Sequence, residues 1–164
     1  MSAVRIGFVM GSISDRPTIE GAEQFLKGME VPYEVRVLSA HRTPEKAREY
    51  ALQARDRGLR AIVALAGMAA HLAGAMAASA SVPVLGVPVA SGSLQGFDAL
   101  LSTVQMPAGV PVATFAIGKA GATNAAVFAC QMMAATDEGL ARRLEDYRKT
   151  MRAKVEKDDA EASR

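Results

Sequence analysis

The chain has 164 residues, a formal net charge of +2 and a single cysteine, Cys130. This length fits one domain with a full core, and so small a charge without a basic run argues against a nucleic-acid partner. One cysteine excludes an internal disulfide and a thiolate metal cluster, and its apolar surroundings predict an ordinary core residue.

Apolar runs typical of strands alternate with helical patterns along the chain. Strands are expected over residues 4–10, 33–38, 61–66, 82–87 and 112–117. Helices are expected over about 17–28, 44–58, 97–104, 122–135 and 137–154, and another is expected to follow the third strand and its loop and to end at 78. Thr43 is able to cap the helix over 44–58, and Pro44 lies in its first turn. Such alternation predicts a parallel sheet covered on both faces. We expect one α/β domain over residues 1–155, flavodoxin-like with five strands and a C-terminal helix, and a frayed polar tail over 156–164.

Residues 61–118 carry only one charged residue, Asp98, which is expected at a helix start or in a buried network. Frequent glycine, proline and alanine argue against a membrane span there. We therefore expect this stretch to supply buried elements and surfaces covered by other subunits. The N-terminal residues enter a strand without a signal region, which predicts a cytoplasmic protein.

Both histidines, His41 and His71, fall in turns that follow predicted strands. Ligands of open parallel sheets bind beyond the carboxyl ends of the strands. The turns over residues 11–15, 39–43, 67–71 and 88–92 are therefore the candidate site.

The first of these turns reads GSISD. Ser12 and Ser14 offer hydroxyl groups beside a helix start, where phosphate is attracted, and Asp15 is placed to accept hydrogen bonds from ribose hydroxyls. Simple capping of the helix by Ser or Asp explains the same pattern equally well.

The second turn, SAHRT, combines a hydroxyl, an imidazole and a guanidinium group. Arg42 is suited to phosphate, Ser39 adds a hydroxyl, and His41 is the one nearby group that takes and gives a proton near neutral pH. A loop carbonyl bound to His41 is the structural alternative. The concentration of polar groups at a strand end favours function.

The third turn places small residues before His71, for which a structural role is the stronger interpretation. Backbone N–H groups of these small residues can face a carboxylate or CO2. Two histidines without clustered carboxylates provide too few ligands for a metal, and we expect no metal site.

Several blocks follow one another between Arg5 and Met133: MGSISD, SAHRTP, GMAAHLAG, LGVPV, SLQGFDALLSTVQMPAGVPVAT and AIGKAGATNAA. Together they resemble the N5-carboxyaminoimidazole ribonucleotide mutase family, the catalytic-subunit type of phosphoribosylaminoimidazole carboxylase. The resemblance implies a flavodoxin-like three-layer subunit, a homo-octamer, and cofactor-free conversion of N5-carboxyaminoimidazole ribonucleotide to 4-carboxy-5-aminoimidazole ribonucleotide in purine biosynthesis.

The resemblance also implies residue roles. Ser12 and Arg42 hold the 5′-phosphate with Ser39 nearby, Asp15 holds the ribose hydroxyls, and His41 is the acid–base. The pocket for the migrating carboxyl group is lined by Gly67, Met68, Ala69, His71 and Leu72. The chain departs from the family pattern at Arg16, Met68, Ala73 and Gly92, where Trp, Gly, Pro and a longer side chain are usual.

Three other functions stay open. Direct carboxylation with free CO2 is the near alternative, although Lys tends to follow the histidine in such enzymes and Arg42 follows it here. A flavin- or nucleotide-binding module without catalysis is disfavoured by an aromatic content of 5%. An inactive oligomeric scaffold is the third.

Overall fold

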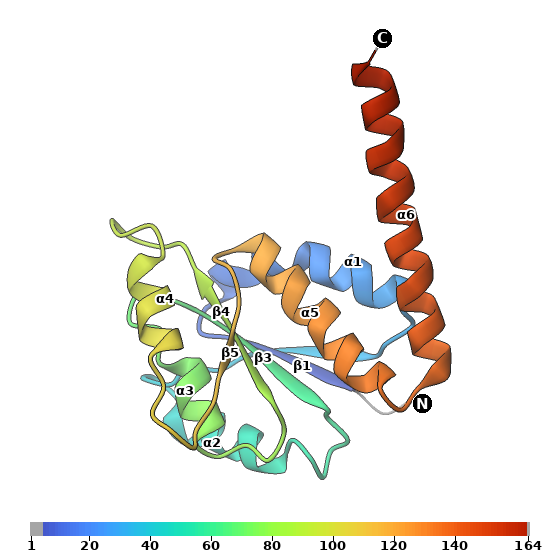
Figure 1. The fold of residues 1–164 in the computed structure, drawn as a ribbon. Coiled ribbons are helices and arrows are strands. Elements are labelled where there is room, and N and C mark those ends of the chain that lie inside the picture. Colours follow the sequence, from blue (N-terminus) through green and yellow to red (C-terminus); the bar gives the residue numbers. More distant parts are fainter. Residues whose placement is uncertain (1–4, 164) are drawn as a thin grey trace. The chain divides into compact units, whose positions relative to one another are not determined.

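A computed structural model describes residues 5–163 (Figure 1). The elements in chain order are β1 (Ile6–Met10), the 3-10 helix η1 (Ile13–Ile19), α1 (Glu20–Gly28), β2 (Tyr33–Val37), α2 (Pro44–Gln53), β3 (Ala61–Gly67), α3 (Leu72–Ala77), β4 (Val84–Val89), α4 (Phe97–Val104), β5 (Ala113–Thr114), α5 (Lys119–Ala134) and α6 (Glu138–Ala162). The chain divides into one compact unit that ends at Ala129 and another that begins at Cys130, and each is described by itself.

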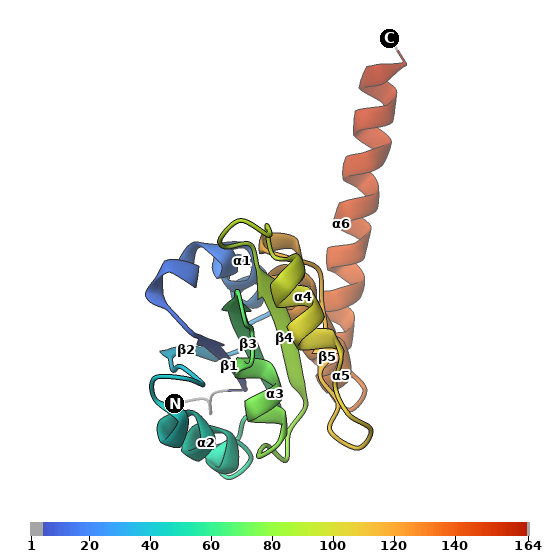
Figure 2. The same ribbon diagram turned by 90° about the vertical axis from the view of Figure 1, so that its left-hand side faces the viewer.

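The first unit contains a five-stranded, all-parallel sheet in the order β2-β1-β3-β4-β5. Figures 1 and 2 show α1 and α5 on one face of this sheet and α2, α3 and α4 on the other. The predicted three-layer α/β fold is therefore confirmed. The strand order reverses between β1 and β3, and this switch point is where sheets of this kind bind ligands.

Close packing of α2 on the sheet depends on Gly7 in β1. A Cβ atom built on Gly7 would overlap the hydroxyl of Tyr50, which reaches over the strand from α2. That hydroxyl donates a 2.8 Å hydrogen bond to Oε1 of Glu34, and Arg57 Nη2 pairs with the same oxygen at 2.5 Å. Burial is the main cause that raises the pKa of Tyr50. The hydrogen bond between Tyr50 and Glu34 thus ties α2 to the sheet within an otherwise apolar contact.

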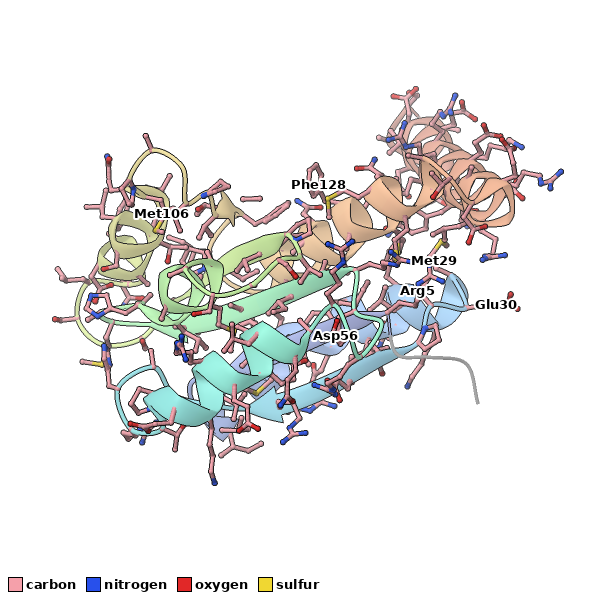
Figure 3. The ribbon with its side chains drawn as sticks, turned by 90° about the horizontal axis from the view of Figure 1, so that it is seen from below. Arg5, Met29, Glu30, Asp56, Met106 and Phe128 are labelled. Atoms are coloured by element: carbon pink, nitrogen blue, oxygen red, sulfur yellow. The ribbon has the colours of Figure 1, made fainter. Side chains whose placement is uncertain are left out.

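The remaining helices of the first unit also approach through small residues. On one face, a Cβ atom on Gly21 of α1 would lie 2.9 Å from Oγ1 of Thr123 in α5. On the other, a Cβ atom on Gly74 of α3 would lie 3.1 Å from Sδ of Met106, which follows α4 (Figure 3). Glycine at these positions lets neighbouring elements pack more closely than an alanine would allow.

Several element boundaries differ from the prediction; β4, for example, spans Val84–Val89 where a strand over 82–87 was expected. The helix expected from residue 17 begins earlier, as η1, because Ser12 Oγ accepts a hydrogen bond from the backbone of Ser14. α2 ends at Gln53 rather than near Gly58, which instead adopts a φ of 87° in the turn to β3. β5 pairs through only two residues, Ala113 and Thr114, where a strand over 112–117 was expected.

The second unit is described separately. Asp137 caps α6, since its Oδ1 accepts a 3.0 Å hydrogen bond from the backbone N–H of Leu140. Residues 156–162, expected to fray, are helical, and the segment is rich in helix-forming Glu, Lys and Ala. Cys130 is buried, as expected of a core residue, and burial raises the pKa of its thiol to about 12.

Candidate active site

A cavity of about 550 Å³ lies at the carboxyl ends of β1, β2, β3 and β4. Its lining comprises Gly11, Ser12, Ser14, Asp15, Ser39, Ala40, His41, Arg42, Ala66, Gly67, Met68, Ala69, His71, Leu72 and Ser91. Every residue that the sequence predicted for the site is among them, from all three of the turns in which candidates were named. Ser91 comes from the fourth turn, which was expected to face the site without a residue being chosen.

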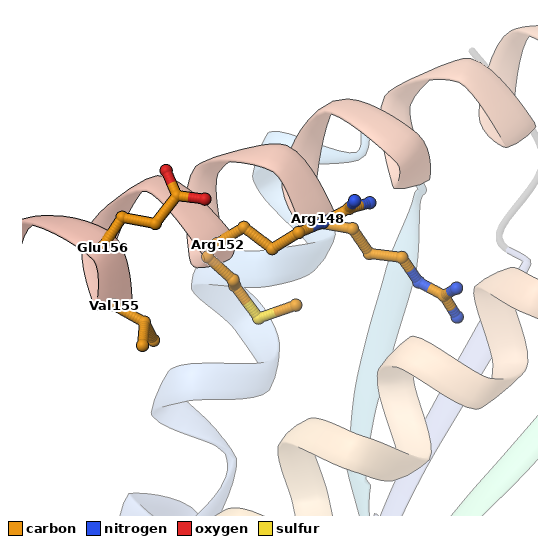
Figure 4. Close-up of a pocket in the computed structure, with 5 residues that line it drawn as sticks. Arg148, Arg152, Val155 and Glu156 are labelled. Carbon is orange, nitrogen blue, oxygen red and sulfur yellow. The ribbon is translucent and has the colours of Figure 1, made fainter.

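A different hollow runs along α6 and is lined by Arg148, Met151, Arg152, Val155 and Glu156 (Figure 4). All these residues belong to one helix, so this hollow is a helix face rather than an enclosed cavity. The strand-end cavity, with walls from four separate turns, is the candidate site.

The turn after β1 contributes two hydroxyls and a carboxylate. The Ser14 hydroxyl donates a 2.8 Å hydrogen bond to Ser12 Oγ. Ser12 also caps η1, so the same serine both caps the helix and lines the cavity. Partial burial is the largest influence on Asp15 and raises the pKa of its carboxyl, while hydrogen bonds to Ser12 and Ser14 oppose this. Asp15 is therefore a half-buried acceptor that faces the cavity.

The turn after β2 is closed by its own hydrogen bonds. Ser39 Oγ accepts a 3.1 Å bond from the backbone of Arg42, and the Thr43 hydroxyl donates to the Ser39 carbonyl at 3.2 Å. Thr43 occupies the N-cap position of α2, but its side chain makes no capping hydrogen bond, which corrects the expected role. Its hydroxyl instead stabilises the turn that carries the imidazole and the guanidinium.

Arg42 links the turns after β2 and β1. Its Nη2 donates a 2.8 Å hydrogen bond to the carbonyl oxygen of Gly11. The side chain is exposed at the cavity, so the other N–H groups of its guanidinium are available to an anion. This bond holds the guanidinium at the turn that also carries Ser12 and Ser14.

The two histidines meet directly. Nε2 of His41 lies 2.8 Å from Nδ1 of His71, and the rings are edge to face with centroids 4.9 Å apart. One nitrogen of this pair must donate and the other accept, so the contact couples the tautomers of the two rings. The structure thus gives His41 an imidazole partner rather than a loop carbonyl, and gives His71 a structural contact at the site.

The third turn carries one of the departures from the family pattern. Met68 adopts a φ of 55°, a left-handed conformation that favours glycine, and its side chain is 61% exposed. Met68 lines the cavity and is one of the large apolar residues that the structure leaves exposed. This geometry accounts for the usual glycine at this position.

The other departures lie outside the cavity lining. Arg16 pairs with Glu23 through both of its terminal nitrogens, at 2.5 and 2.8 Å. Ala73 is buried in α3, and Gly92 adopts a φ of 70° in the loop before α4. Asp98 lies in the first turn of α4, as expected, and its Oδ1 is buried without a hydrogen-bond partner among residues 5–163.

Within the described part of the chain, no three His, Cys, Asp or Glu side chains are grouped as metal ligands would be. None of the described helices combines the length and apolar character that a membrane crossing requires.

The chain is similar to known proteins over most of its length. It is 53% identical over 150 residues to N5-carboxyaminoimidazole ribonucleotide mutase of Bacillus subtilis, covering 92% of this chain and 93% of that protein. It is 51% identical over 151 residues to the Escherichia coli K12 protein of the same name, covering 92% and 89%. A crystal structure of Treponema denticola PurE superposes with a TM-score of 0.85 at 26% identity, covering 97% of this chain and 98% of that one.

The family model described as AIR carboxylase matches residues 5–154, which include the strand-end turns that form the cavity. On this match and these identities, the chain belongs to the AIR carboxylase family.

Proposed function

We propose that this protein is an isomerase of de novo purine biosynthesis that converts N5-carboxyaminoimidazole ribonucleotide to 4-carboxy-5-aminoimidazole ribonucleotide. Its relatives at 50–56% identity carry the mutase name. The observation that carries the proposal is the strand-end cavity, in which the His41–His71 pair lies with the turn that carries Arg42 and a loop of small residues.

The polar groups along the cavity are arranged in an order that matches the phosphate, ribose and base of a nucleotide. Arg42 and Ser12 bind the 5′-phosphate, with the Ser39 hydroxyl beside them, and the Asp15 carboxylate accepts hydrogen bonds from the ribose hydroxyls. These groups follow β2 and β1, while the small-residue loop from Gly67 follows β3. The heterocycle therefore lies beside His41 and that loop.

The reaction then needs no group beyond the substrate and one acid–base. The N-carboxylate leaves as CO2 while His41 gives a proton to the departing nitrogen. C4 of the resulting aminoimidazole attacks the retained CO2, and His41 removes the C4 proton to restore aromaticity. Retention of CO2 replaces a bimolecular encounter with a high effective concentration, and the acid–base contributes about 10²–10⁴-fold.

Direct carboxylation of aminoimidazole ribonucleotide is the competing activity. Arg42 after His41 favours the mutase, because the direct carboxylases tend to have Lys there. The purified protein should form the C4-carboxylated nucleotide from the N-carboxylated one without added bicarbonate, as chromatography of the products will measure. Turnover only from aminoimidazole ribonucleotide plus bicarbonate would contradict the proposal.

The enzyme is a homo-octamer of one mutase domain, residues 1–155, and acts in the cytoplasm. Support for assembly comes from α4, on which Phe97, Leu101 and Val104 form one stripe and are 66, 60 and 48% exposed. A lone subunit rarely leaves such a stripe in water. Light scattering after gel filtration should give eight times the 17.2 kDa subunit mass, and Leu101→Glu should reduce it. A 17.2 kDa species for the unmodified chain would contradict this.

A further inference from the structure

Ser91 is a cavity residue to which the proposed function assigns no role. It lies two residues beyond β4, and its hydroxyl fills the space above Gly67 at the end of β3. A Cβ atom on Gly67 would overlap Ser91 Oγ and would lie 3.0 Å from the carbonyl oxygen of Val89. The missing side chain of Gly67 therefore sets where the Ser91 hydroxyl sits.

This hydroxyl makes no hydrogen bond with any other residue of the described range 5–163. A serine hydroxyl has one hydrogen to donate and two lone pairs to accept with. Ser91 lines the cavity and its neighbour Gly67 has no side chain to bond it, so a ligand bound in the cavity can be its partner. Ser91 is thus a positioned donor that the protein itself does not use.

The strand order tells which end of a ligand meets Ser91. Arg42 follows β2, at one side of the sheet, whereas Ser91 follows β4, with β1 and β3 between them. A ribonucleotide whose phosphate lies at Arg42 and whose ribose lies at Asp15 extends its base towards β3 and β4. Ser91 therefore faces the heterocycle, opposite the phosphate end.

Building on the proposed function, we propose that the Ser91 hydroxyl donates a hydrogen bond to the carboxylate carried by the heterocycle. The small-residue loop after β3 borders the carboxylate on one side, and Ser91 completes the wall from the β4 side. The contact forms an O–H···O⁻ bond without transfer of the proton. Ser91 is then a substrate-binding residue that distinguishes a carboxylated nucleotide from an uncarboxylated one.

Calorimetric titration with two nucleotides that differ only in the carboxylate tests this inference. Product 4-carboxy-5-aminoimidazole ribonucleotide and bare 5-aminoimidazole ribonucleotide are titrated into full-length protein, into Ser91→Ala and into Ser93→Ala, all carrying His41→Asn to prevent conversion. Ser93 is in the same loop but outside the cavity lining and serves as the matched control. Ser91→Ala should weaken the carboxylated nucleotide roughly 10- to 100-fold, the scale of a hydrogen bond to a charged group. It should change the bare nucleotide less than twofold, and Ser93→Ala should change neither.

Equal losses for both nucleotides would place the hydroxyl elsewhere and overturn the inference, as would no loss for either. Thermal unfolding of the variants shows that each is folded before titration. Failure of the protein that carries His41→Asn alone to bind either nucleotide would refute the proposed function and this inference together. Binding of both with no selective loss in Ser91→Ala would refute the inference alone.

Discussion

Replacement of Arg42 by alanine should weaken nucleotide binding and leave the chemical step nearly unchanged. The guanidinium has five N–H donors, and one of them is used on the Gly11 carbonyl at 2.8 Å. The remaining donors can hold two phosphate oxygens at once. In the proposed function Arg42 binds the phosphate end of the substrate and not the heterocycle, so its loss should appear in the dissociation constant.

The magnitude follows from the number and the exposure of these bonds. A hydrogen bond to a charged group contributes about 1.5–3 kcal/mol, and solvent screening at the exposed Arg42 reduces the sum. We expect a total loss of about 2–3 kcal/mol, which corresponds to roughly 30- to 150-fold in the dissociation constant. The dissociation constant of Arg42→Lys should lie between those of the unmodified protein and Arg42→Ala, because an ammonium group reaches either the Gly11 carbonyl or the phosphate but does not hold both.

Calorimetry of product binding, with steady-state kinetics beside it, checks this prediction. Arg48→Ala is the matched control, since Arg48 is an exposed residue of α2 outside the cavity and carries the same charge. The loss in Arg42→Ala should shrink as ionic strength rises. Equal effects of Arg42→Ala and Arg48→Ala, or a loss confined to kcat, would refute the phosphate contact.

Three further predictions concern packing, pH and reactivity. Gly7→Ala should lower the free energy of unfolding by about 2–3 kcal/mol, because the added methyl group overlaps the Tyr50 hydroxyl. In denaturant melts, Gly7→Ala/Tyr50→Phe should be more stable than Gly7→Ala. If the losses of the two single variants simply added in the double variant, the overlap would be refuted. The raised pKa of Asp15 means that the folded chain holds this proton more tightly than the unfolded chain, so its ionisation costs stability as pH rises above the ordinary 3.8. At neutral pH the melting temperature of Asp15→Asn should therefore be equal to or higher than that of the unmodified protein, and any increase should disappear in acid. Ribonucleotide binding should weaken in the same variant. A lower melting temperature at neutral pH would contradict the destabilising effect of Asp15 ionisation. Cys130, with a thiol pKa of about 12, should react with maleimide only after unfolding, and rapid labelling of the folded protein would contradict its burial.

The sequence predicted the layers and the location of the site because both follow from local pattern. Buried parallel strands read as continuous apolar runs, and α4 was expected over the same residues that the structure gives it. Since ligands bind beyond strand ends, the turns alone brought Ser12, His41 and His71 into one predicted site. None of this required knowledge of side-chain direction.

The contacts within the site were beyond prediction because they depend on three-dimensional register. His41 and His71 follow β2 and β3, which are separated by β1, so their contact requires two turns to bend towards each other across the end of a third strand. Ser91 was missed because its position depends on the space left by Gly67, 24 residues earlier. Such matches between distant turns leave no periodic signal in the chain.

Turnover of the N-carboxylated nucleotide by His41→Asn tests the central claim most directly. Arg48→Ala, which changes an exposed residue of α2 outside the cavity, is the control and should retain the turnover of the unmodified protein. His41→Asn should lose at least about 10²-fold in kcat while it still binds the product nucleotide and assembles as before. Turnover by His41→Asn equal to that of the unmodified protein would contradict it.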